Sequence, residues 1–329
     1  MKKMNKARLL WPDVARGVLI LLVVIGHTLQ HGDYEHNVLW NVIYSFHMAA
    51  FFAISGYVSY KPKAKWSILG RRAKQLLVPF CLWSLIESIC IGNTGAKLFE
   101  FLVYPDSGFW FVYALFFIIA LMVGFNKLSD YLNVNNLYII GGGNLLIIGL
   151  MVLMEWRMFG FQFVAFYFFF YALGFFIRKN EIRISMTMSM VLGLLWLLTA
   201  IFWHGHEVPV PLSSFQMIPA SILIYSYRFL SATLGSLFVL GISPYIFSDS
   251  QSVVCRLFSY LGNVSLGIYI IHAFVALMID HYGLLLPYFR STTSYSFLVS
   301  YFMICLSLSL FLIWVMSKNK ITSLLLLGK

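Results

Sequence analysis

Long apolar runs recur along the whole chain and are separated by short polar segments. Runs such as Val18–Ile25 and Ile139–Leu153 lack the alternation of polar and apolar positions that a membrane β-strand shows. The pattern predicts an all-α fold in which about ten segments cross a membrane. The expected segments are approximately Asp13–His31, Val38–Tyr60, Leu76–Ile91, Gly108–Phe125, Leu137–Met154, Phe159–Ile177, Met186–Trp203, Ser221–Phe247, Leu261–Asp280 and Tyr295–Met316.

The composition supports this prediction and excludes most other classes of protein. Of the 329 residues, 60% are hydrophobic and 11% are charged, whereas a soluble domain has about 45–50% apolar and about 25% charged residues. A soluble globular enzyme, a disordered chain, a coiled coil and a disulfide scaffold are therefore excluded. We expect one integral-membrane domain over residues 1–329, a polytopic transmembrane helical bundle. The four cysteines show no metal-ligand spacing and are expected to be small apolar residues.

The distribution of charge predicts the orientation in the membrane. With the N-terminus inside, ten spans place 18 Lys and Arg residues on the cytoplasmic side and 3 on the other side. The positive-inside rule therefore predicts that both termini are cytoplasmic. The net charge of +11 is then a consequence of topology, and no nucleic-acid partner is expected. No small-residue cleavage site follows the first segment, which we expect to be retained as a helix rather than removed as a signal peptide.

Ionisable side chains lie inside several predicted spans, where each costs about 2.5–3.5 kcal/mol at a helix centre. A rise of about 1.5 Å per residue places His47, Glu87 and His272 close to mid-membrane, with His27 somewhat further outward. Titratable groups at similar depth on four spans predict a shared polar cavity. The complete set is Arg16, His27, His47, Glu87, Arg228 and His272.

Arg16 and His27 are expected to share one face of the first helix. Eleven steps of about 100° end roughly 20° beyond three full turns and span about 16 Å. This face would carry Arg16 at the cytoplasmic mouth and His27 deep inside, which suits a substrate with phosphates at one end and a reacting group at the other. Asp13, three residues before Arg16, can pair with it across one turn.

Structural interpretations compete with functional ones at several of these positions. His272 taken alone fits a structural hydrogen bond to a neighbouring helix as well as it fits a catalytic role. Arg228 could extend to the membrane surface or form a structural ion pair with Glu87. The basic run Arg71–Lys74 is typical of an anchor for lipid headgroups. No metal site is expected at the outer histidines, which lack a matching carboxylate pattern and are His31, His36, His204 and His206.

Two motifs near the N-terminus resemble the membrane proteins of acyltransferase family 3. Arg16 and His27, with ten residues between them, match the Arg-x10-His signature of that family. The segment Ser45–Tyr57 is similar to its second signature, an aromatic-rich span with Phe-x3-Ser-Gly, in which Ser55 is the serine. Together these two motifs are fairly specific.

Weaker similarities continue along most of the chain in the order expected for the family. Arg71–Lys74 resembles the basic loop after the second span, and Trp110 resembles the tryptophan of the fourth helix. Tyr260–His272, which includes Tyr269, resembles the late Ser…Tyr…His helix. The chain looks closest to the fucose 4-O-acetylase-like and capsular or exopolysaccharide O-acetyltransferases. Many larger relatives carry an SGNH-type esterase domain, and because we expect none here, the membrane domain would complete the transfer.

The resemblance implies a cytoplasmic acyl-CoA donor, most often acetyl-CoA, and a glycan hydroxyl as acceptor, with no bound cofactor. Acyl transfer to an alcohol needs a base near neutral pH, and histidine is the usual side chain for that role. His27 is the expected general base or covalent acyl carrier. His47 would orient it, bind the acceptor or share the relay, while Glu87 would fix a histidine tautomer or bind a sugar hydroxyl.

The remaining candidates divide between the two substrates. Three arginines are expected to bind the phosphates of CoA, because bidentate guanidinium contacts to phosphate are strong; they are Arg16, Arg71 and Arg72. The residues expected to contact the acceptor or line the cavity are Ser55, Trp110, Arg228, Tyr269 and His272.

A transporter or flippase for lipid-linked sugars is the competing function, because it could use the same cavity and the same histidines as a proton relay. Against it, the sequence shows no pair of Gly/Pro-broken spans in corresponding halves. We expect a multi-pass protein of the plasma or inner membrane. Its expected partners are acyl-CoA, a glycan or lipid-linked sugar and membrane lipids, with a second copy of the chain or polysaccharide-assembly proteins as further candidates.

Overall fold

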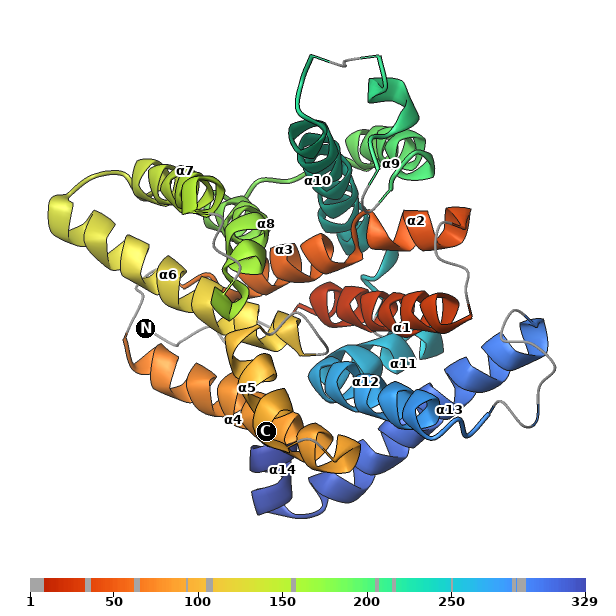
Figure 1. Ribbon diagram of the computed structural model, residues 1–329. Helices are drawn as coiled ribbons and strands as arrows, with labels where there is room; N and C mark the ends of the chain where they lie inside the picture. Colours follow the sequence, from red (N-terminus) through yellow and green to blue (C-terminus); the bar gives the residue numbers. More distant parts are fainter. Residues whose placement is uncertain are drawn as a thin grey trace.

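The computed structural model describes residues 9–32, 37–61, 66–92, 94–104, 109–154, 158–204, 207–214, 217–249, 251–285, 288 and 294–329. All regular structure in these ranges is helical, so the all-α prediction is confirmed (Figure 1). The elements are α1 (Trp11–His31), α2 (Val38–Tyr44), α3 (His47–Ser59), α4 (Ser67–Ile91), α5 (Thr94–Val103), α6 (Trp110–Leu132), α7 (Asn136–Met154), η1 (Met158–Gly160), α8 (Phe161–Lys179), α9 (Met186–Ile201), η2 (Val210–Leu212), α10 (Ala220–Ile246), α11 (Val253–Asn263), α12 (Ser265–His281), α13 (Tyr295–Ser317) and α14 (Lys320–Leu327).

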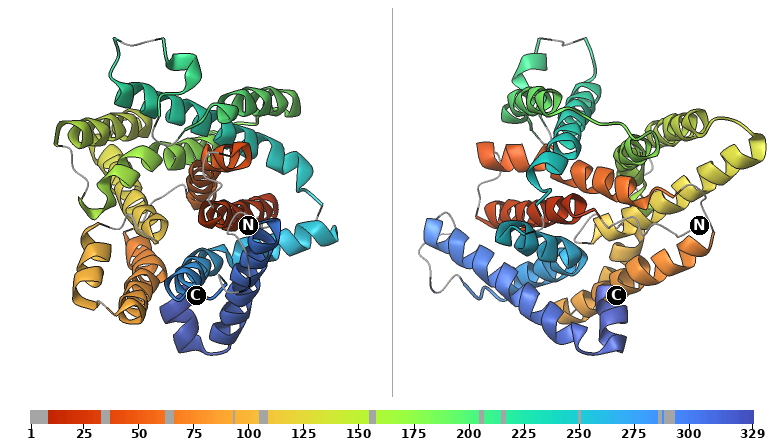
Figure 2. Two further views of the ribbon diagram at one scale, coloured as in Figure 1. Left: turned by 45° about the vertical axis from the view of Figure 1, so that its right-hand side comes forward. Right: turned by 180° about the vertical axis from the view of Figure 1, so that it is seen from behind.

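Helix α1 lies at the centre of the bundle. It contacts α3 on one side and α11, α12 and α13 on the other, as the front view (Figure 1) and the view from behind (Figure 2, right) show. Helices α4 and α6 pack together, α8 covers α3, and α9 packs on α10 at the far side of α3. The C-terminal α14 returns to α4, where the Trp83 indole donates a hydrogen bond to the Leu326 carbonyl at 3.0 Å. The first helix is thus surrounded by protein, which is where a polar face in a membrane protein is tolerated.

Two helix pairs approach so closely that only glycine fits between them. A methyl group on Gly17 of α1 would overlap the Phe258 carbonyl of α11. A methyl group on Gly56 of α3 would likewise overlap the Tyr171 carbonyl of α8. Small residues are typical of helix interfaces in membranes, because they let backbones come into van der Waals contact. These contacts fix the positions of the two helices that carry Arg16, His27 and His47.

Among the residues that the structure describes, seven helical stretches are long and apolar enough to cross a membrane, and the bent pair α11–α12 would be an eighth. The multi-pass helical bundle is therefore established, with fewer clear spans than the ten predicted from sequence. All ten predicted segments are helical, but α7 and α9 are shorter apolar helices. The 16 residues of α9 extend about 24 Å, less than the roughly 30 Å hydrocarbon core of a bilayer.

Two segments that were predicted as continuous spans are interrupted. The chain leaves helical geometry at Phe46, between α2 and α3, where φ is −146°. Helices α11 and α12 meet at Val264 with a bend of 68°. Both interruptions lie against α1, and each places a polar side chain at a helix start, His47 on α3 and Ser265 on α12. Helix α5 was not predicted and lies between the third and fourth of the ten expected segments.

Candidate active site

An internal cavity of about 170 Å³ lies among α1, α3, α4, α6, α8 and α12. At one end its wall carries the polar side chains of Arg16, Ser55, Arg72 and Ser265. These come from the start of α1, α4 and α12 and from the later half of α3, so the antiparallel helices bring them to one level. At the other end the wall is formed by larger apolar and aromatic side chains, including Met48, Phe111 and Tyr269.

Two further pockets follow the polar end of this cavity, each sharing wall residues with the one before it. A pocket of about 70 Å³ shares Ser59, Arg72 and Tyr171 with it and adds Arg71 and Lys61. The second pocket in turn shares wall residues with a polar pocket of about 520 Å³. The three neighbouring pockets therefore form a row, with the large polar pocket at one end, the arginines in the middle and the cavity within the bundle at the other end.

Side-chain hydrogen bonds order the wall of the large polar pocket. The Lys179 ammonium donates to the Asn136 side-chain oxygen at 2.5 Å, and the Asn136 amide donates to Asn126 at 3.1 Å. Lys61 and Lys179 both line this pocket. Together with Arg71 and Arg72 deeper in the row, they give it a basic wall suited to an anionic ligand.

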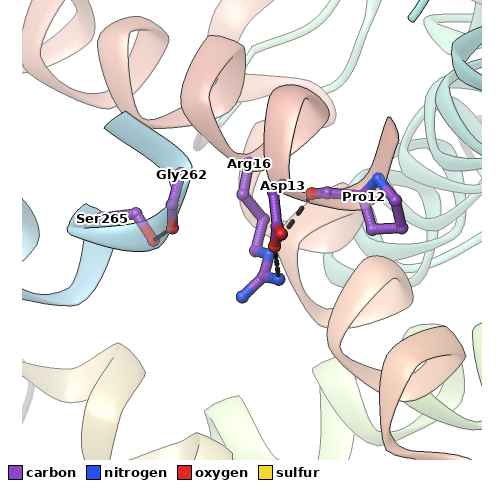
Figure 3. Close-up of polar contacts among 5 residues, drawn as sticks. All are labelled: Pro12, Asp13, Arg16, Gly262 and Ser265. Carbon is purple, nitrogen blue, oxygen red and sulfur yellow. Dashed lines mark hydrogen bonds and ion pairs between the residues drawn. The ribbon is translucent and has the colours of Figure 1, made fainter. Parts of the chain in front are cut away.

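Arg16 is held at the edge of the cavity by its own helix. Its guanidinium pairs with the Asp13 carboxylate, and its Nε donates to the Pro12 carbonyl at 3.3 Å. Figure 3 shows the side chain extending from α1 beside the bend that carries Gly262 and Ser265. The Asp13 side chain is 5% exposed and that of Arg16 is 27% exposed, so the acid is covered while the cation remains accessible. The pairing that the sequence predicted between these two residues is present.

Three histidines and a tyrosine form a cluster deeper in the bundle. The rings of His27 on α1 and His272 on α12 lie 5.3 Å apart between centroids. Tyr44 lies at the end of α2, and the centroid of its ring is 6.5 Å from that of His27 and 5.1 Å from that of His47. The tyrosine ring therefore lies between the two histidines. His47 and His272 are buried, with exposed fractions of 5% and 1%. The structure thus brings together the three histidines that the sequence singled out.

Two of these histidines have a defined tautomer. His272 Nδ1 lies 2.8 Å from the Ile268 carbonyl, and His47 Nδ1 lies 2.6 Å from the Ile43 carbonyl. A carbonyl only accepts hydrogen bonds, so Nδ1 carries the proton and the neutral ring keeps a free electron pair on Nε2. His272 Nε2 is buried without a hydrogen-bond partner. A buried polar atom without a partner costs about 1–3 kcal/mol, and the electron pair on this nitrogen is available to accept a proton.

Tyr269 connects the cavity to the histidine cluster. Its side chain lines the cavity, and its ring lies 6.1 Å from that of His272, one turn further along α12. The Phe111 backbone N–H donates to the Tyr269 hydroxyl at 3.3 Å, and the two rings contact edge to face at 5.3 Å. Tyr269 and Phe111 therefore form the boundary between the cavity and the imidazoles.

Two other predicted residues lie on α4 and α6. Glu87 is buried on α4, one turn from Trp83, whose ring contacts Phe274 of α12. Trp110 stacks on Phe163, with ring centroids 4.4 Å apart, in an aromatic layer between α6 and α8. The cavity wall that Trp110 was expected to form contains its neighbour Phe111.

Arg228 lies on the other side of the histidine cluster. It stands within 6 Å of the rings of Trp203, Phe166 and Tyr225 and lines a small pocket that Tyr44 also reaches. Its helix, α10, packs on α9 and α3, whereas α4 packs on α6 and α14 (Figure 1). The structural ion pair considered between Arg228 and Glu87 is therefore not supported, since their helices lie on opposite sides of α1 and α3.

Sequence analysis missed the polar cluster outward of the histidines. His31 Nδ1 lies 2.6 Å from an Asp280 carboxylate oxygen, and the His31 ring stacks on Tyr301 at 5.1 Å. The spacing of four residues between His27 and His31 was a usable signal, because it places both on one helix face. Within the part of the chain that the structure describes, no group of three or more His, Cys, Asp and Glu side chains is arranged to hold a metal ion. His36 and His206 lie outside that part.

Comparison with known proteins decides the family. A family model described as an acyltransferase domain matches residues 9–318. The chain belongs to acyltransferase family 3. The match covers nearly the whole chain, including Arg16, the three histidines and Asp280, so the resemblance seen in the sequence motifs is confirmed and the chain carries an acyltransferase domain.

Curated relatives match over a shorter stretch. Nodulation protein NolL of Sinorhizobium fredii is 34% identical over 139 residues, which is 36% of this chain and 38% of that protein. Nodulation protein NolL of Mesorhizobium japonicum is 34% identical over 143 residues, or 36% of this chain and 37% of that protein. The aligned part is thus little more than a third of either relative. No solved structure matches the chain.

Proposed function

We propose that this protein transfers an acyl group, in the first instance acetyl, from acyl-CoA to a hydroxyl of a cell-surface or lipid-linked glycan. The observation that carries the proposal is that the His27–His272 pair lies beside Tyr269, which lines the same cavity as Arg16 and Arg72. Membership of an acyltransferase family and the multi-pass bundle support a reaction at the cell membrane.

The row of cavities fits the donor. Acyl-CoA carries phosphates at one end and the thioester at the other, joined by a long arm. Arg71 and Arg72 line the second pocket, and Arg16 and Arg72 line the cavity, so each of these two pockets carries two guanidinium groups. Guanidinium binds phosphate through two parallel hydrogen bonds, which positions as well as attracts the donor. The donor arm would then pass Ser55 and reach Tyr269.

The imidazoles supply the chemistry. His27 acts as the general base or as a covalent acyl carrier at the boundary formed by Tyr269. His272, with a free electron pair on Nε2 and its ring 5.3 Å away, accepts a proton from His27 or passes one to it. His47 contacts Tyr44 and so helps to position His27. Glu87, buried on α4, is proposed as the group that fixes a histidine tautomer or binds a sugar hydroxyl. The thioester C–S bond breaks, the ester C–O bond forms, and the hydroxyl proton ends on the CoA thiolate.

The acceptor is proposed from the resemblance to glycan O-acetyltransferases. The hydroxyl would reach the cluster from the end of α1 that carries His31, opposite the arginines. Membrane lipids surround the bundle, and a second copy of the chain or polysaccharide-assembly proteins are proposed as further partners.

The test uses purified full-length protein in lipid nanodiscs with radiolabelled acetyl-CoA and polysaccharide from a strain lacking the gene. We expect wild type to release CoA thiol and label the polysaccharide, and His27→Ala to abolish both while accumulating normally in membranes. His281→Ala is the matched control, since His281 is an exposed histidine at the end of α12. Labelling by His27→Ala near the wild-type rate would contradict its role.

The same strains distinguish the enzyme from a transporter. Proton NMR of surface polysaccharide should show an acetyl resonance that only wild type restores to the deletion strain. An unchanged acetyl pattern with less polysaccharide exported would instead support a flippase, and the transfer proposal would be wrong.

A further inference from the structure

A histidine–carboxylate pair lies between α1 and α12, outward of the His27–His272 pair. His31 Nδ1 lies 2.6 Å from Asp280 Oδ2, a distance typical of a strong hydrogen bond. With Nδ1 as the donor to the carboxylate, the neutral His31 ring keeps a free electron pair on Nε2. A carboxylate that holds one nitrogen of an imidazole fixes its tautomer and stabilises the imidazolium that forms when the other nitrogen takes a proton.

The ring of His31 is fixed on two sides. Its plane lies 23° from that of Tyr301 of α13, with ring centroids 5.1 Å apart. Tyr301 is 1% exposed, and its hydroxyl lies 3.4 Å from both oxygens of Asp280. The tyrosine therefore supports both members of the pair from behind and makes His31 a positioned imidazole rather than a free surface side chain.

The pair is open on its other side. The side chains of His31 and Asp280 are 30% and 41% exposed, in contrast to the buried Tyr301. A neutral sugar hydroxyl can therefore approach His31 from outside the bundle. The three rings of the inner cluster, by comparison, lie behind Tyr44 and α12.

The outer pair is also aligned with the inner one. His27 and His31 are four residues apart on α1, about 6 Å along the helix axis, so their side chains share a face. His272 and Asp280, their partners, both lie on α12. The interface of α1 and α12 thus carries two imidazole-containing pairs in sequence, with the inner one next to the donor cavity.

We propose that His31 is a second catalytic base that accepts the proton of the acceptor hydroxyl, with Asp280 as its positioning residue. This inference rests on the acyl transfer proposed above. The hydroxyl O–H bond breaks and its proton passes to His31 Nε2, while the oxygen forms a bond to the acyl carbonyl carbon. The C–S bond breaks and the thiolate leaves with its electron pair. The proton then reaches the thiolate through His27, so the ester and the free thiol are the only products.

The test separates base catalysis from a structural role by changing the nucleophile. Hydroxylamine is a strong neutral nucleophile and does not require prior deprotonation, whereas a sugar hydroxyl does. For His31→Ala we expect transfer to polysaccharide to fall about 100-fold or more, with hydroxylamine-dependent cleavage of acetyl-CoA within about twofold of wild type. Asp280→Asn should lower kcat for polysaccharide at least about tenfold and leave KM for acetyl-CoA unchanged.

Two controls make the result specific. His281→Ala, one residue from Asp280, should match wild type with both nucleophiles. Tyr301→Phe keeps the stacked ring and loses only the 3.4 Å contacts of its hydroxyl with Asp280, so it should lower transfer less than Asp280→Asn does. The proposal would be overturned if His31→Ala labelled polysaccharide at the wild-type rate, or if it lost both reactions to the same extent. If wild type cleaved acetyl-CoA with neither nucleophile, the proposed function itself would fail.

Discussion

Replacing His272 by leucine should make the protein more stable and less active. His272 is 1% exposed, and its Nε2 is buried without a hydrogen-bond partner. Leucine has a similar volume and removes that atom, which relieves a penalty of about 1–3 kcal/mol. The change also removes the hydrogen bond from Nδ1 to the Ile268 carbonyl, a net loss of about 0.5–1.5 kcal/mol. The Ile268 carbonyl still accepts the i→i−4 bond of the helix, so no new unpaired atom arises.

Together the two ranges give a change in the free energy of unfolding of about −0.5 to +2.5 kcal/mol, with a central value near a gain of about 1 kcal/mol. His47→Leu is the matched comparison, because it loses an equivalent bond, to the Ile43 carbonyl, without removing a buried unpaired atom. That variant should be destabilised by about 0.5–1.5 kcal/mol.

Both free energies can be measured by unfolding in mixed detergent micelles, followed by tryptophan fluorescence, alongside acetyl transfer from acetyl-CoA. A functional His272 predicts that transfer by His272→Leu falls at least about 100-fold while stability is maintained. If His272→Leu instead lost more stability than His47→Leu and kept wild-type transfer, His272 would be a structural histidine and its assignment to the relay would be wrong.

Two further changes test the framework and the donor end. Gly17→Leu should destabilise the bundle by at least about 1–3 kcal/mol, because the side chain would overlap the backbone of α11. Gly141→Leu is the control and should leave the stability unchanged, because nothing lies within 4 Å of a Cβ atom at that position. Thermal unfolding of the two variants measures the difference. Arg16→Lys keeps the charge but loses the planar fork, so KM for acetyl-CoA should rise about tenfold with little change in kcat, whereas Arg256→Lys on the exposed face of α11 should leave both constants unchanged. An unchanged KM in Arg16→Lys would remove it from the donor site.

Periodicity within one helix was the most informative part of the sequence. The spacing of Arg16 and His27 predicts a shared face, and in the structure Arg16 lies beside the start of α12 while His27 contacts His272 further along it. The Asp13–Arg16 pair follows from the same rule. The depth of each residue in the membrane was also predictable, because it can be counted from the ends of the apolar segments. This count placed His47 and His272 at a depth similar to that of His27.

Relations between helices were not predictable in the same way. Asp280 is unremarkable in sequence and becomes a partner of His31 only because α12 packs on α1. Arg228 and Glu87 are both charged residues at plausible depths, but the order of helices around α1 places them apart. The interruption at Phe46 also escaped detection, since a run of apolar residues reads the same whether it forms one helix or two.

The central position of α1 has a consequence for how this protein could diversify. Arg16, His27 and His31 are all carried by one rigid helix, so their relative spacing does not depend on how the surrounding helices are arranged. The partners of the outer histidine, by contrast, come from the ends of α12 and from α13. Changes in those outer ends could alter which hydroxyl is accepted while the spacing between the donor arginine and the reacting imidazole stays constant. Helix α1 would then keep the distance between the donor-binding and catalytic side chains constant, and the outer ends of α12 and α13 would determine which acceptor is selected.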